Sequence, residues 1–218
     1  MAFKGGARDN KVYAIIAIFI VLIIVIAVFF STNRLTAAII EEDILGESWN
    51  EDLTERDSYS GFLGLEKWVS YTYANDNRDY PAYVSVTSFK TLFMMNEEEI
   101  KAKTLETLEQ ASEQNIVLDE ASKVSGTRAS NNGHKTYYFT YNGSDTSQYP
   151  FEKIKIIGET WNCGVSGSSV ICIGFAQITD DSVTNTDYWE DIVKDAEGTF
   201  GLGEFQGEDG LLFNVKCH

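Results

Sequence analysis

Cysteine spacing gives this sequence its clearest candidate for chemistry. Cys163 and Cys172 flank a segment whose centre, Gly167-Ser168, suits a two-residue type II′ turn with glycine first. Counting outward from that turn places the two cysteines opposite each other at a non-hydrogen-bonded position, where Cα atoms lie about 4.5 Å apart. A disulfide can span this separation, so we predict a disulfide between Cys163 and Cys172. Two alternatives stay open: free buried thiols on neighbouring strands, or a bridge from either cysteine to Cys217.

Metal and cofactor chemistry have little support in the sequence. There is no CxxC pair, and the only histidines are His134, beside an expected turn, and His218. We therefore expect no zinc site and no cofactor, and we expect His134 to face solvent from a strand. A calcium site remains an alternative, because five acidic residues fall at expected strand ends: Asp76, Asp79, Asp180, Asp181 and Asp187.

Catalytic motifs are also missing. The chain has no GxSxG elbow, no HExxH pair and no glycine-rich phosphate loop before a helix, so we predict a protein that is not an enzyme. The alternative is a hydrolase that uses paired carboxylates, with Asp180-Asp181 or Glu204 and Glu208 as candidates.

One modification motif is present. Asn142-Gly143-Ser144 is an acceptor sequence for N-glycosylation, and we expect it in a loop after a strand over residues 137–141. Asn142 is therefore a predicted glycosylation site if this part of the chain is exported.

An unbroken apolar run, VYAIIAIFIVLIIVIAVFF, covers residues 12–30. As a helix it would be roughly 28 Å long, close to the hydrocarbon thickness of a bilayer. Three basic residues precede it and acids follow it, so we expect residues 1–11 in the cytoplasm and the rest outside the cell membrane. The predicted organisation is a tail (1–11), a transmembrane helix (12–30), a stalk or loosely attached layer (31–57) and a domain (58–218). A cleaved signal peptide and a pilin-like filament subunit are the alternatives.

Net charge narrows the class of partner. The chain carries −16 in total and residues 1–11 carry +2, which leaves −18 for the remainder. Such a surface repels phosphate backbones, so we expect no nucleic-acid partner. Membrane lipid around residues 12–30, and a protein or cell-wall partner of the exported domain, are the expected contacts.

The elements that must position these residues are hairpins and two helices. Runs at 67–73 and 83–89, 122–129 and 134–141, and 154–163 and 170–178 predict three antiparallel hairpins, the second around Asn132-Gly133. Asn96 with Glu99 predicts the capped start of a helix that continues to Gln114, and Thr186 caps a second helix. We expect an α+β fold, in which an antiparallel sheet carries helices on both faces.

The order of these elements resembles a known family. The segments GHKTYYFTY, KIKIIGETW, VICIGFAQITDD and YWEDIVKDAEGTF resemble the PsbP-like α/β/α sandwich proteins, and the chain is similar to membrane-anchored or exported PsbP-related proteins of archaea. The resemblance covers about 130 residues. It implies a PsbP-like sandwich and a binding or assembly role. Together with the apolar run, it predicts a single-pass membrane-anchored, extracytoplasmic, non-enzymatic module.

Overall fold

A computed structural model describes residues 34–61, 66–75, 81–110, 115–130, 132–147, 149–178, 187–194 and 210–218. All of these residues except Arg34 belong to one compact unit, Leu35 to His218. The predicted tail (1–11) and transmembrane segment (12–30) lie outside the described residues. In the described ranges, no helix combines the length and apolar character that a membrane crossing requires.

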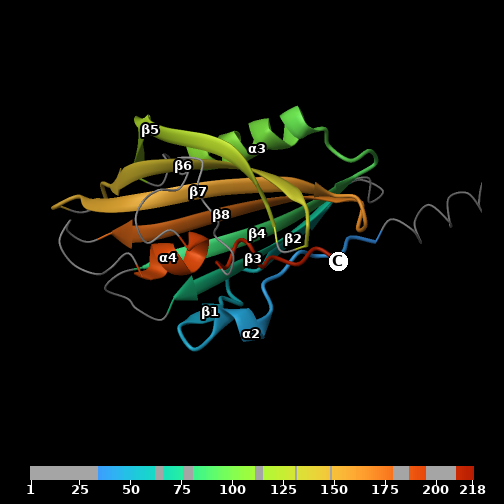
Figure 1. The fold of residues 1–218 in the computed structure, drawn as a ribbon, viewed down its shortest axis with the longest axis horizontal. Coiled ribbons are helices and arrows are strands. Elements are labelled where there is room, and N and C mark those ends of the chain that lie inside the picture. Colours follow the sequence, from blue (N-terminus) through green and yellow to red (C-terminus); the bar gives the residue numbers. More distant parts are fainter. Residues whose placement is uncertain are drawn as a thin grey trace, which may run out of the picture. The chain divides into compact units, whose positions relative to one another are not determined.

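One antiparallel sheet dominates the fold (Figure 1). Its strand order is β1-β3-β4-β8-β7-β6-β5, and β2 pairs with β3 beside this path. The bounds are β1 Trp49–Glu51, β2 Asp57–Ser60, β3 Glu66–Asn75, β4 Ala82–Thr91, β5 Ile116–Ala129, β6 Lys135–Asp145, β7 Glu152–Cys163 and β8 Ser168–Ile178. The three predicted hairpins are confirmed as β3–β4, β5–β6 and β7–β8.

The helix α3, Glu97–Gln110, lies on one face of the sheet over β7 and β8. Its predicted start is confirmed, because the Asn96 side chain accepts from the Glu99 N–H and the Glu99 carboxylate accepts from the Asn96 N–H, at 2.9 and 2.8 Å. Leu108 packs with Tyr141, Ile154 and Ile156 beneath the helix. Gly158 permits this contact, since a Cβ there would come within 2.9 Å of Leu108.

The opposite face of the sheet packs against short helices and non-helical chain. It is packed by α4, Asp187–Val193, by the short α2, Glu42–Leu45, and by non-helical chain at 35–41 and 210–218. The two non-helical segments pair through an isolated antiparallel bridge between Ile39 and Lys216. Buried apolar residues from these segments join the sheet in the larger core: Ala38, Ile40, Trp49, Trp189, Ile192, Leu212 and Val215. The stretch predicted to be a stalk, residues 31–57, therefore contributes to this core from Ala38 onward.

The predicted fold class, an α+β sandwich with helices on both faces, is wrong. The N-terminal transmembrane helix predicted in front of it lies outside the described residues and stays a prediction. Strands make up most of the fold, and α3 is the only helix longer than two turns in the part of the chain that the structure describes. Non-helical chain covers much of the second face. Ile39 and Lys216 pair through two backbone hydrogen bonds, and the N–H groups of Ala38 and Ile40 donate to side chains of the sheet.

Candidate metal centre

The cysteine hairpin has a different register from the predicted one. Cys163 lies opposite Ser168, and Cys172 lies opposite Glu159. A four-residue loop, Gly164 to Gly167, replaces the two-residue turn: the Gly167 N–H donates to the Cys163 carbonyl at 2.8 Å, and Gly167 has a φ of 64°. Four residues of strand separate the two cysteines, about 13 Å, which a disulfide cannot span. The predicted Cys163–Cys172 bridge is therefore wrong, and all three cysteines are free thiols.

Cys163 instead takes part in a cluster of two thiols and two imidazoles. Cys163, Cys217, His134 and His218 each offer one ligand atom, and these atoms all lie within 4.8 Å of one another. Cys163 ends β7, His134 directly precedes β6, and Cys217 with His218 belongs to the segment 210–218. Three segments that are far apart in the sequence thus meet at one end of the sheet.

Local hydrogen bonds hold His134 in place. The Ser130 N–H donates to the His134 carbonyl at 2.9 Å, and the His134 N–H donates to the Ser130 hydroxyl at 3.2 Å. The Asn132 amide donates to the carbonyl of Val215 at 3.0 Å, which ties this turn to the segment that carries Cys217. Asn132-Gly133, predicted as a hairpin turn, therefore also sets the distance between two members of the cluster.

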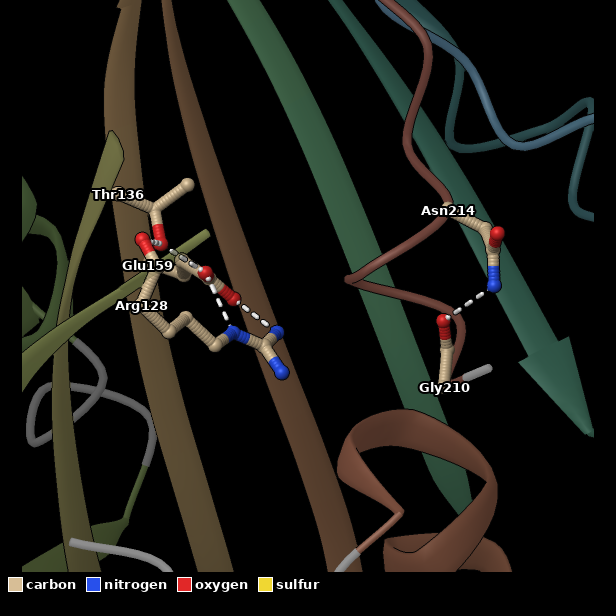
Figure 2. Close-up of polar contacts among 5 residues, drawn as sticks. All are labelled: Arg128, Thr136, Glu159, Gly210 and Asn214. Atoms are coloured by element: carbon tan, nitrogen blue, oxygen red, sulfur yellow. Dashed lines mark hydrogen bonds and ion pairs between the residues drawn. The ribbon is translucent and has the colours of Figure 1, made fainter. Parts of the chain in front are cut away.

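The segment 210–218 also contacts the N-terminal segment 35–41 and is stabilised by a turn within itself. Ile39 and Lys216 exchange two backbone hydrogen bonds, both of 2.9 Å, and Lys216 forms an ion pair with Glu41. Nearer its start, the Asn214 amide donates to the Gly210 carbonyl at 3.0 Å, which closes a turn (Figure 2). These contacts help to position Cys217 and His218 in a segment that itself forms no regular strand or helix.

The distances in the cluster match tetrahedral metal coordination. The sulfur of Cys217 lies 3.3 Å from His134 Nε2 and 3.5 Å from His218 Nδ1, and the sulfur of Cys163 lies 3.4 Å from His218 Nδ1. Around zinc, bonds of about 2.3 Å to sulfur and about 2.0–2.1 Å to nitrogen place sulfur and nitrogen ligands about 3.6 Å apart. Three of the six distances between ligand atoms are therefore close to those of a zinc tetrahedron, and all six are within 4.8 Å.

Protonation in the cluster is linked between the two thiols. Burial raises the pKa of Cys163, but hydrogen bonds from Cys217, Ser166 and His218 outweigh it and hold the pKa below its ordinary value. The pKa of Cys217 rises to about 12, because the thiol is buried and hydrogen-bonded to Cys163. Cys163 is therefore the thiol that loses its proton first. A bound divalent cation would stabilise the two thiolates that form when both thiols ionise. Burial and the neighbouring His218 lower the pKa of His134, which favours the neutral imidazole that binds metals.

A second buried polar cluster joins Arg128, Thr136 and Glu159 (Figure 2). The Glu159 carboxylate, 1 % exposed, accepts from Arg128 Nε at 2.8 Å and from the Thr136 hydroxyl at 2.5 Å, and it forms a second contact with Arg128 Nη2. Both carboxylate oxygens thus have partners inside the protein. We interpret this cluster as a structural ion pair between β5, β6 and β7.

Other predicted site residues are placed as follows. Asn142 is exposed but lies inside β6, opposite Asp119 and Lys155, and not in a loop; its glycosylation stays a prediction. His134 is half-buried and contacts Cys217, so its predicted solvent-facing position is wrong. Of the acids considered for calcium, Asp187 opens α4. The remaining candidate acids for calcium or hydrolysis lie outside the described residues: Asp76, Asp79, Asp180, Asp181, Glu204 and Glu208.

Sequence reasoning missed the cluster because its members follow no local spacing. The signal that was available is compositional: both histidines of the chain and two of its three cysteines belong to the cluster.

Comparison of the chain with protein-family models, curated proteins and solved structures finds no match. The resemblance to PsbP-like proteins accordingly stays a prediction, and the function is argued from the site.

Proposed function

We propose that this chain is a zinc-binding, membrane-anchored module in which the metal fastens the segment 210–218 to the sheet. The observation that carries the proposal is the cluster of two thiols and two imidazoles at sulfur–nitrogen distances of 3.3–3.5 Å. Zinc is the ion that this set suits best, because it accepts thiolate and imidazole together in tetrahedral geometry.

Four protein ligands favour a structural role over a catalytic one. Catalytic zinc keeps a coordination position for water or substrate, whereas a tetrahedron filled by protein side chains leaves none. The proposed ion joins β7, the turn before β6 and the segment 210–218. Its binding free energy would therefore add to the stability of the folded domain, which supports a non-enzymatic binding or assembly role.

Membrane anchoring is the second part of the proposal. Its support is the apolar run at residues 12–30 with basic residues before it and acidic residues after it. In this arrangement the acidic domain lies outside the cell membrane, where it presents a binding surface to a protein or cell-wall partner.

Metal content tests the zinc proposal directly. The full chain, purified in mild detergent under reducing conditions and passed over a weak chelating resin, should retain one zinc ion per molecule. Cys163→Ser and Cys217→Ser should each lose most of it. Cys172→Ser is the matched control: it replaces a buried cysteine that lies opposite Glu159, outside the cluster, and should keep the zinc.

Oxidation provides the competing outcome. Since the sulfurs of Cys163 and Cys217 lie within 4.8 Å, an exported chain could instead join them as a disulfide. The native protein would then lack zinc and weigh two hydrogens less than the reduced chain in intact-mass measurement. That result, or equal zinc content in Cys172→Ser and Cys163→Ser, overturns the zinc proposal.

A further inference from the structure

Exposed apolar side chains gather on two loops at one end of the sheet. Leu92, Phe93 and Met94, in the connection from β4 to α3, are 48, 81 and 46 % exposed, and Val165, in the β7–β8 loop, is 73 % exposed. We call these four residues the apolar tip. Contact between water and large apolar side chains is unfavourable. A partner surface that covered these four side chains would remove that contact.

Each of the two loops is hydrogen-bonded to the strand that leads into the other. The ammonium group of Lys90 donates to the Ser166 carbonyl at 3.4 Å, and the Asn162 amide donates to the Met95 carbonyl at 2.8 Å. Cys163, a proposed zinc ligand, directly precedes the β7–β8 loop. These hydrogen bonds hold the two loops of the apolar tip in a fixed position at the end of the sheet.

The chain enters the folded unit at this same end (Figure 1). The Ala38 N–H donates to the hydroxyl of Ser88, near the end of β4, and the Ile40 N–H donates to the hydroxyl of Tyr73, which lies opposite Val84. From Ala38 to Ile40 the chain thus runs along β4 away from the apolar tip. Leu35, where the compact unit begins, accordingly lies toward the tip.

Little chain separates that entry point from the apolar run. The run ends at Phe30, and five residue steps to Leu35 span at most about 18 Å. A membrane that held residues 12–30 would therefore keep the entry end of the sheet within reach of its surface. The apolar tip lies at this end, so the bilayer is present at high effective concentration beside it.

We propose that the apolar tip inserts into the boundary between headgroups and acyl chains of the bilayer that anchors the chain. This inference rests on the proposed membrane anchor and adds an orientation to it: the end of the sheet with the β7–β8 loop faces the membrane. Three acids, Glu97, Glu98 and Glu99, form the first turn of α3 directly behind the tip. Their charge limits insertion to a shallow depth, because carboxylates stay in the aqueous headgroup region.

Tryptophan quenching by lipid tests the proposal in the full chain. Phe93→Trp places a reporter on the tip, and Phe151→Trp is the matched control: Phe151 is also exposed, at 58 %, but precedes β7 at the opposite end of the sheet from Cys163. Each protein is reconstituted into phosphatidylcholine vesicles with or without bromine atoms on the acyl chains, and the spectrum of the unsubstituted protein is subtracted.

The added tryptophan of Phe93→Trp should shift to shorter wavelength on reconstitution and lose intensity with brominated lipid, while that of Phe151→Trp should do neither. Equal behaviour of the two reporters in vesicles that carry the protein on flotation overturns the membrane-facing tip and leaves the anchor standing. Failure of the unsubstituted chain to float with the vesicles overturns the anchor and the tip together. Both substitutions replace exposed side chains, and near-ultraviolet circular dichroism verifies that each variant keeps its tertiary packing.

Discussion

The buried ion pair between Arg128 and Glu159 makes a stability prediction that the structure defines closely. The side chains of Arg128 and Glu159 are 7 and 1 % exposed, and two contacts join them. Arg128→Met removes the guanidinium group but keeps an unbranched apolar side chain along most of its stem. The Glu159 carboxylate would then retain the Thr136 hydroxyl as its remaining partner among the contacts described above.

The expected loss of stability follows from the Glu159 charge that is left buried without its cationic partner. Removing one partner of a buried ion pair costs about 3–5 kcal/mol of unfolding free energy, because the other charge stays in a low-dielectric site. For a folded unit of this size the melting temperature should fall by roughly 6–20 °C. Replacing both residues, Arg128→Met with Glu159→Leu, should recover most of the loss, since no charge is then left buried.

Urea unfolding followed by tryptophan fluorescence measures these free energies, and an unchanged denaturant slope shows that the unfolding transition is the same. Arg56→Met is the matched control, because Arg56 pairs with Glu51 at 2.5 Å on the surface, with a side chain 46 % exposed. It should cost about 1 kcal/mol or less. The reasoning is refuted if Arg128→Met costs no more than Arg56→Met, or if the double replacement is as unstable as the single one.

Two further predictions concern the larger core. Gly174→Ala should destabilise the fold by about 1–3 kcal/mol, because the new Cβ would lie 2.7 Å from Ile192 of α4 and 2.8 Å from Ile157 of β7; Gly164→Ala, with nothing within 4 Å, should be nearly neutral in the same urea assay, and equal costs would contradict this account. Burial raises the pKa of Tyr73 to about 12, above its ordinary value of 10.0. A folded-state pKa above the unfolded one gives stability that is complete below about pH 10 and is lost as the pH rises to about 12, here about 2–3 kcal/mol. Tyr73→Phe should remove that loss, and an identical alkaline decline in both proteins would show that another group causes it.

Features that depend on local chemistry were predictable from the sequence. The capping box of α3 needs only Asn96 and Glu99 at the correct spacing, and the β5–β6 hairpin needs the turn at Asn132-Gly133. In both cases the interacting groups are near neighbours in the chain, so the residues themselves specify the geometry.

Long-range pairing accounts for what the sequence did not reveal. The choice between a two-residue turn and the four-residue loop at Gly164 to Gly167 moves Cys163 from opposite Cys172 to opposite Ser168. The packing of segments 35–41 and 210–218 on the second face depends on the Ile39–Lys216 bridge. In the sequence, Ile39 and Lys216 lie near opposite ends of the folded unit. That same bridge brings Cys217 and His218 to Cys163, so the candidate metal centre follows from tertiary structure and from no motif.

X-ray absorption at the zinc edge of the purified full chain tests the central claim most directly. We predict a first coordination shell of two sulfur atoms at about 2.3 Å and two nitrogen atoms at about 2.0–2.1 Å, reduced to one sulfur atom in any zinc that Cys217→Ser retains. A shell of oxygen and nitrogen alone, or a shell that Cys217→Ser leaves unchanged, would contradict the assignment of Cys163, Cys217, His134 and His218 as a zinc centre.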